Sequence, residues 1–125
     1  MYPVAFGFID SENENNWIWF MSQLQRAIGS PPHLAICTDA CKGLENAVHK
    51  VFPHADQREC FRHLMQNFVK YFYGDGLSRM YPAARAYRTE IFDHHMSKIV
   101  SSCPEVMKYL QRHHSLKWMR CAFDP

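Results

Sequence analysis

The clearest change from a strand pattern to a helix pattern lies in Leu34-Ala35-Ile36-Cys37-Thr38-Asp39-Ala40-Cys41-Lys42-Gly43-Leu44. A short apolar run ends in an aspartate, and a helical pattern begins a few residues later. Apolar runs of this length, preceded here by turn-forming residues at 29–32, are typical of a strand buried on both faces. Chemistry in α/β sheets gathers at the carboxyl ends of such strands. Asp39 therefore has two interpretations, a functional acid or a helix N-cap.

The composition predicts one domain with a sizeable core, because the 125 residues are 47% hydrophobic and 14% aromatic. The formal net charge of +2 and the pI near 8.3 are too small a basic excess to identify a nucleic-acid partner. Five cysteines without a secretory leader favour a reducing intracellular compartment. The sequence has no apolar stretch long enough to span a membrane, so we expect no membrane association.

Upstream of the central stretch, alternating apolar residues predict a strand over residues 2–9 with both faces buried. A polar break follows, in which Ser11 and Glu14 have the spacing of a capping box. The predicted helix after it ends at Gly29. Its single apolar stripe consists of Trp17, Phe20, Met21, Leu24 and Ile28.

Downstream, two further apolar stripes flank a short polar segment, residues 54–59, which fits a brief edge strand. One stripe ends before Pro53, and the other begins at Phe61 and ends before Gly74. The resulting order of strand, helix, strand and helix predicts a parallel or mixed sheet with helices packed on it.

The strand signals vanish after residue 76. Helices are predicted at residues 82–87, after a Thr89 cap and after Pro104. We therefore divide the chain into an α/β region, residues 1–76, and an all-helical region, residues 77–125. The predicted fold class is α/β followed by α, with about three strands.

Cys60-x-x-His63 is the second distinctive feature. At positions i and i+3 of a helix start, the two side chains face the same way and can share a ligand. One interpretation is a tetrahedral zinc site completed by Cys37-x-x-x-Cys41. We favour instead a buried cysteine and a helix-start histidine, and expect no zinc, because Cys37 lies inside the apolar run and neither pair has a glycine-rich knuckle.

Arg58, Arg62, His63 and Lys70 form a predicted basic edge beside Asp39. Such charges can bind the phosphates of DNA, although a solvated face is the default interpretation of a basic cluster. The sequence contains neither a glycine-rich phosphate loop nor a nucleophile elbow.

Together these motifs resemble the plant Mutator-like element (MULE) transposase domain, in the right order along essentially the whole chain. The resemblance rests on Tyr2-Pro3-Val4-Ala5-Phe6-Gly7, Ser11-Glu12-Asn13-x-x-x-Trp17-x-Trp19-Phe20, Thr38-Asp39-x-x-Lys42-Gly43-Leu44, Val51-Phe52-Pro53-x-Ala55, Cys60-x-x-His63-Leu64-x-x-Asn67 and the Trp118 region. It implies a ribonuclease-H-like fold with a helical insertion, here residues 77–125, and membership of the DDE-type transposases.

The resemblance also implies roles for individual residues. Asp39 is similar to the second acid of the catalytic triad and would ligate paired Mg²⁺ or Mn²⁺ ions, which such reactions use to activate the attacking oxygen and stabilise the leaving oxygen. Cys60 and His63 match the C-x-x-H signature, and His63 is expected near the scissile phosphate. Implied partners are transposon-end DNA and a possible second copy of the chain, and the implied location is the nucleus.

Two catalytic acids of the family are expected outside this sequence, the first upstream and the third, a glutamate, downstream of Trp118. The chain is then a fragment with an incomplete ribonuclease-H-like core, and we expect it to be inactive alone. The alternative hypothesis is a non-catalytic DNA-binding or transcription-regulatory module domesticated from such a transposase. Salt-dependent DNA binding that survives loss of Asp39 would favour that alternative.

Overall fold

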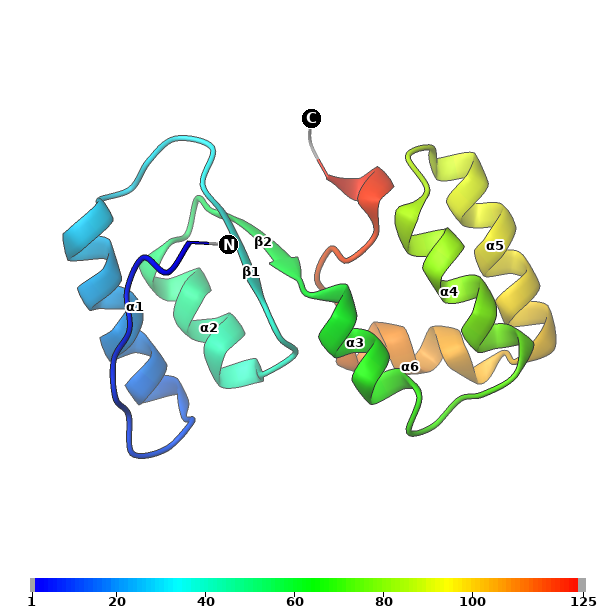
Figure 1. Ribbon diagram of the computed structural model, residues 1–125, viewed down its shortest axis with the longest axis horizontal. Helices are drawn as coiled ribbons and strands as arrows, with labels where there is room; N and C mark the ends of the chain where they lie inside the picture. Colours follow the sequence, from blue (N-terminus) through cyan, green and yellow to red (C-terminus); the bar gives the residue numbers. More distant parts are fainter. Residues whose placement is uncertain (1, 124–125) are drawn as a thin grey trace. The chain divides into compact units, whose positions relative to one another are not determined.

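The computed structural model describes residues 2–123, which form two compact units divided between Arg58 and Glu59. Within these residues there are six α-helices, one 3₁₀ helix and one parallel sheet of two strands (Figure 1). The order β1–α2–β2–α3 matches the predicted order of strand, helix, strand and helix. The sequence predicts a different boundary, after residue 76, where the strand patterns end. That division into a ribonuclease-H-like core and a helical insertion stays a prediction.

The first unit is built from β1 (Ala35–Thr38), α1 (Glu14–Ile28) and α2 (Lys42–Val51), with β2 (Asp56–Glu59) paired to β1. Helix α1 packs along α2, and α2 in turn contacts β1. The core of this unit is the apolar set Met21, Leu44, Ala47, Val48 and Phe52. The Gln25 amide also donates a hydrogen bond of 2.8 Å to the carbonyl of Val51, which ties the ends of the two helices together.

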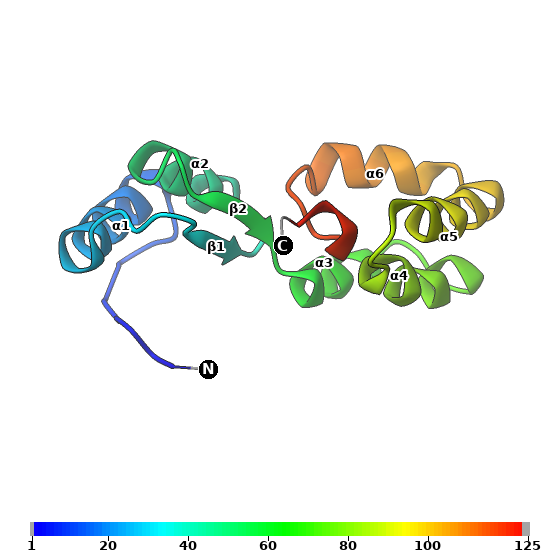
Figure 2. The same ribbon diagram turned by 90° about the horizontal axis from the view of Figure 1, so that it is seen from above.

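Residues 2–9 do not form the predicted strand. They make no backbone–backbone hydrogen bond within residues 2–123, and Figure 2 shows the segment running apart from both strands. Phe6 and Phe8 are 89% and 92% exposed, so the expectation of two buried faces is also wrong. The alternation of apolar residues is present in the sequence. A strand, however, needs a neighbouring strand to satisfy its N–H and C=O groups, and residues 2–9 pair with neither β1 nor β2. The sheet therefore has two strands and not three.

Strand β1 has one exposed face, contrary to the expectation that both faces are buried. Ile36 packs against the core of the first unit and Thr38 is buried, whereas Ala35 and Cys37 are exposed. A strand alternates its side chains between two faces, and α2 covers only one of them here.

The cap of α1 differs from the predicted Ser11 capping box. The N-cap is Asn13, whose side-chain oxygen accepts a hydrogen bond of 2.8 Å from the N–H of Asn16. Ser11 supports this cap from outside the helix, since its hydroxyl accepts a hydrogen bond of 2.8 Å from the Asn13 amide. Asn and Ser are about equally good N-caps, so the sequence alone did not separate them.

The second unit is helical, with α3 (Phe61–Phe68), α4 (Asp75–Arg85), α5 (Thr89–Ser102), α6 (Glu105–His113) and the 3₁₀ helix η1 (Arg120–Ala122). Helices α4 and α5 pack side by side, and η1 contacts both (Figure 1). The fully buried side chains of this core are Leu64, Phe68, Met80, Ala83, Ile99 and Val106.

Helix α4 begins seven residues earlier than the predicted helix at 82–87 and contains Pro82 in its interior. A proline there loses one backbone hydrogen bond and costs about 3 kcal/mol. Met80 and Ala83 on either side are fully buried, so tertiary packing outweighs that cost. The start of α5 also differs slightly, because Thr89 is its first residue and Arg88 holds the cap position.

Within residues 2–123, none of the helices combines the length and apolar character needed to cross a membrane. The five cysteines form no disulfide.

Candidate functional site

Asp39 follows the last residue of β1, at the carboxyl end of the strand. One carboxylate oxygen, Oδ1, accepts a hydrogen bond of 3.1 Å from the N–H of Cys41, which is the N-cap position of α2. This Asx turn directs the chain from the strand into the helix. The other oxygen, Oδ2, makes no hydrogen bond or ion pair with the residues that the structure describes. The N-cap interpretation of Asp39 is therefore wrong, because Cys41 holds that position; Asp39 closes the turn before the helix and keeps one oxygen available to a ligand.

Two buried polar atoms without a partner among the described residues belong to the same strand–helix segment. They are the hydroxyl of Thr38 and Oε1 of Glu45, in the first turn of α2. The other oxygen of Glu45 pairs with Lys42 at 2.9 Å. A buried polar group without a partner costs about 1–3 kcal/mol. Water, an ion or a ligand normally satisfies such groups, so the segment around Asp39 is suited to a polar ligand.

Carboxylate oxygens are the ligands that Mg²⁺ and Mn²⁺ prefer. Asp39 Oδ2 fits one position in such a coordination sphere. Across residues 2–123, no group of three or more His, Cys, Asp or Glu side chains is close enough to hold a metal ion. The described residues thus fit a single metal ligand at Asp39 and do not make up a complete two-metal centre.

Cys60 and His63 lie at the start of α3, in the second unit, whereas Asp39 lies in the first. Cys60 holds the N-cap position, is half-buried and makes no side-chain capping hydrogen bond. His63 is exposed in the first turn and makes no hydrogen bond within the described residues of the chain. The geometry leaves His63 accessible, and its catalytic role stays a prediction.

The three predicted DNA-binding residues differ in their local contacts. Arg58 pairs with Asp56 at 2.8 Å, and Lys70 donates a hydrogen bond of 3.0 Å to Asn67. Arg62 is exposed and makes no ion pair with the residues described. Of the three, Arg62 is the one whose charged group has no intramolecular partner among the described residues.

A buried contact between a carboxyl group and an imidazole in the second unit was not predicted. Glu59, at the end of β2, contacts the ring of His114, just after α6, and both side chains are at most 1% exposed. The other ring nitrogen of His114 lies 3.3 Å from the Tyr109 hydroxyl. Burial raises the pKa of Tyr109, with smaller contributions from Tyr71 and Glu59. The partners are 55 positions apart in the sequence, so no spacing signal predicted the contact.

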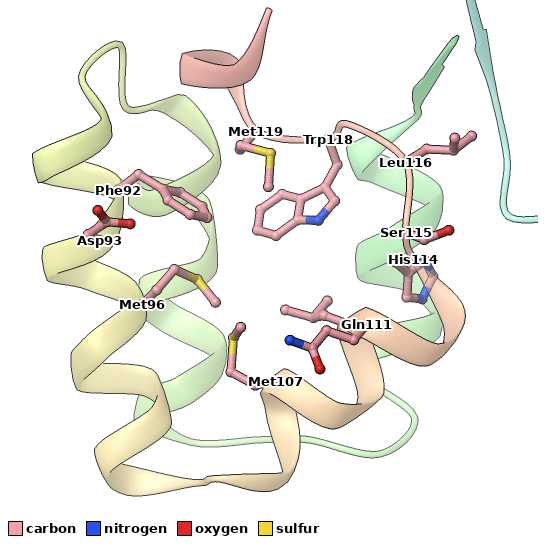
Figure 3. Close-up of a pocket in the computed structure, with 11 residues that line it drawn as sticks. Phe92, Asp93, Met96, Met107, Gln111, His114, Ser115, Leu116, Trp118 and Met119 are labelled. Atoms are coloured by element: carbon pink, nitrogen blue, oxygen red, sulfur yellow. The ribbon is translucent and has the colours of Figure 1, made fainter.

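The second unit also contains an apolar pocket of about 380 Å³ between α5, α6 and the segment that follows α6. Figure 3 shows the thioethers of Met96, Met107 and Met119 around the Trp118 indole. Asp93 is the only carboxylate among the residues that line it. The pocket therefore lacks the paired acids that metal-dependent DNA cleavage requires.

The comparison with known families decides the lineage. The sequence profile of the MULE transposase domain matches residues 1–67, more than half of the chain. This chain belongs to the MULE transposase domain family. The matched MULE residues include Asp39, Cys60 and His63, whereas the Trp118 region, which also carried the resemblance, lies outside the match.

A curated protein also resembles a segment of this MULE-family chain. It is the PKS-NRPS hybrid synthetase cheA of Chaetomium globosum, 31% identical over 67 residues. The alignment covers 51% of this chain and 1% of that protein. The chain thus spans about one hundredth of the length of this curated relative.

Proposed function

We propose that this chain belongs to the catalytic region of a DDE-type Mutator-like transposase with a ribonuclease-H-like core. The intact protein would cleave DNA and transfer its strands with Mg²⁺ or Mn²⁺. The observation that carries the proposal is Asp39, an acid at the carboxyl end of β1 with one available oxygen, inside the family match. Plant lineage, a nuclear location and self-association are included in the proposal and follow from the resemblance to plant members.

When bound, the metal ions would activate the attacking oxygen and stabilise the leaving one. The N–H of Cys41 fixes the Asp39 carboxylate by its Oδ1 and leaves Oδ2 to face a ligand. His63 is exposed and can donate a hydrogen bond to a phosphate oxygen. A two-metal centre needs more than one carboxylate. In this chain the family motifs assign a catalytic role to one acid, Asp39. We therefore propose that this chain contributes to the reaction without performing it alone.

The test is a Mn²⁺ titration of the full chain followed by ¹H–¹⁵N NMR, because Mn²⁺ broadens the signals of nearby amides. We expect the strongest broadening at residues 38–42 and its loss in Asp39→Asn. The matched control is Asp56→Asn, since Asp56 is an aspartate of the same unit that is already paired with Arg58. Broadening that persists in Asp39→Asn, or that is strongest elsewhere, contradicts the assignment of Asp39 as a metal ligand.

A further inference from the structure

The charge of the chain is divided unevenly between its two units. Residues 1–58 contain four Lys or Arg and six Asp or Glu, a formal net charge of −2. Residues 59–125 contain ten Lys or Arg and six Asp or Glu, a net charge of +4. One of those six acids, Glu59, is buried against His114. A polyanion such as DNA is therefore attracted to the second unit and repelled by the first.

Two arginines of the second unit lie over tyrosine rings. The guanidinium carbon of Arg120 is 4.0 Å from the ring centroid of Tyr87, and that of Arg85 is 5.8 Å from the centroid of Tyr81. Such cation–π contacts hold a guanidinium in place without neutralising its charge. Neither arginine forms an ion pair within residues 2–123. Both charges thus remain available to phosphate groups.

These four residues, the arginine–tyrosine surface, come from neighbouring elements. Tyr81 and Arg85 are four residues apart on α4 and so share a face of that helix. Tyr87 follows the end of α4, and Arg120 begins η1, which contacts α4 (Figure 1). The arginine–tyrosine surface therefore lies around the carboxyl end of α4.

Both tyrosines of this surface are accessible to a ligand. Tyr87 is 73% exposed and Tyr81 is 46% exposed. Exposed aromatic rings beside arginines are the arrangement that binds single strands, in which bases stack on rings and cations hold the phosphates. A duplex offers few such contacts, because its bases are already stacked on one another.

We propose that the arginine–tyrosine surface binds single-stranded nucleic acid, with Arg85 and Arg120 on phosphates and with bases stacked on Tyr81 and Tyr87. The proposal deepens the proposed function, on which it rests, by naming the form of DNA and the unit that holds it. It adds a binding surface that is separate from Asp39 and independent of a metal ion.

The experiment measures anisotropy of a fluorescent 20-nucleotide oligo-dT and of a duplex of the same length with the full chain in EDTA. We expect tighter binding of the single strand. Tyr87→Leu should weaken it about 5- to 150-fold, because stacking of one base on an aromatic ring contributes about 1–3 kcal/mol. Tyr87→Phe keeps the ring and should bind like the wild type.

A pair of double variants separates this surface from general electrostatics. Arg85→Gln/Arg120→Gln should weaken binding more than 10-fold and reduce the salt slope by about 1.4, because two arginines no longer neutralise phosphates. Lys98→Gln/Arg112→Gln, on α5 and α6, removes the same charge and should weaken binding about 2- to 3-fold by the screened long-range effect. All four positions are exposed, so the fold is expected to persist, and circular dichroism checks it.

The outcomes are distinguishable. Equal losses in the two double variants, or wild-type affinity in Tyr87→Leu, would overturn the arginine–tyrosine surface. Duplex bound as tightly as single strand would overturn it as well, and the proposed transposase function would stand. If the wild-type chain binds neither form of DNA, the arginine–tyrosine surface is overturned, whereas the proposed function is overturned only by the outcome of its Mn²⁺ titration.

Discussion

At the scale of single residues, Asp39 uses its two carboxylate oxygens differently. Oδ1 closes the turn into α2 through Cys41, and Oδ2 has no intramolecular partner among the described residues. Asp39 is not the N-cap of α2, but its role in the turn is compatible with a role in binding a ligand. A conservative change to Asn preserves an oxygen for the turn and removes the charge, which is why Asp39→Asn is the informative variant.

The buried contact between Glu59 and His114 gives a residue-scale prediction about stability. Replacing His114 by Ala leaves the Glu59 carboxyl group buried without its partner, and Glu59→Leu leaves His114 with only its 3.3 Å contact to Tyr109. Each single change should lower the free energy of unfolding by about 3–5 kcal/mol, and the double variant should cost clearly less than the two losses added together. Urea denaturation of the four proteins measures this cycle.

Independent, additive losses in that cycle would contradict the pairing. Tyr109→Phe serves as the control, because it removes only the 3.3 Å contact to the far ring nitrogen of His114. We expect it to cost about 1 kcal/mol, the ordinary net contribution of one hydrogen bond.

The sequence predicted the candidate site incompletely, for reasons that these residues show. Asp39 was found because a strand pattern that ends in an acid is a local signal. Glu59 and His114 were missed because no local pattern marks a contact between residues 55 positions apart. The salt bridge between Arg58 and Asp56 was missed as well, since charge along the sequence does not reveal which neighbour a side chain will pair with.

At the scale of elements, α1 and α2 are joined by their apolar faces and by an ion pair between Glu14 and Lys50. The hydrogen bond from Lys50, with a smaller one from Asn46, lowers the pKa of Glu14. A carboxyl group whose pKa is lower in the folded state stabilises the fold above its unfolded pKa and loses that effect as the pH falls through the folded value. The contribution is therefore present at pH 7 and lost in acid.

The lowered pKa of Glu14 leads to a prediction about how the stability of Glu14→Gln depends on pH. The variant should be less stable than the wild type at pH 7, by a small amount typical of an exposed pair, and equally stable near pH 2. Thermal unfolding at both pH values checks it, with Glu12→Gln as the control because Glu12 is an exposed acid two residues away. A difference that persists at pH 2 would contradict the role of the ion pair.

Helices were predicted well and strands less well. An apolar stripe with period 3.6 satisfies its hydrogen bonds inside the helix, so α1, α2 and α6 follow from local sequence. Residues 2–9 carry an equally clear strand pattern, yet a strand is defined by its neighbours. At α4 the error was the opposite one, because the predicted helix was too short. Pro82 was expected to start a helix, whereas the packing of Met80 and Ala83 maintains a helix that begins before it.

At the scale of the whole molecule, the family match and the charge distribution fall on different regions of the chain. The MULE match covers residues 1–67, which include Asp39, whereas the basic excess lies in residues 59–125. Under the two proposals, the acid that serves the chemistry and the surface that holds the nucleic acid are separate. Variants at Asp39 should therefore leave DNA binding in EDTA unchanged.

The central proposal is that this chain contributes one acid, Asp39, to a metal-dependent DNA-cleaving centre that it does not complete by itself. The most direct measurement incubates the purified chain with supercoiled DNA and Mn²⁺ or Mg²⁺, beside Asp39→Asn, and follows nicked circles on a gel. The account predicts no nicking above the buffer control in either protein. Nicking by the wild type that disappears in Asp39→Asn would contradict it, because the chain would then be a complete nuclease by itself.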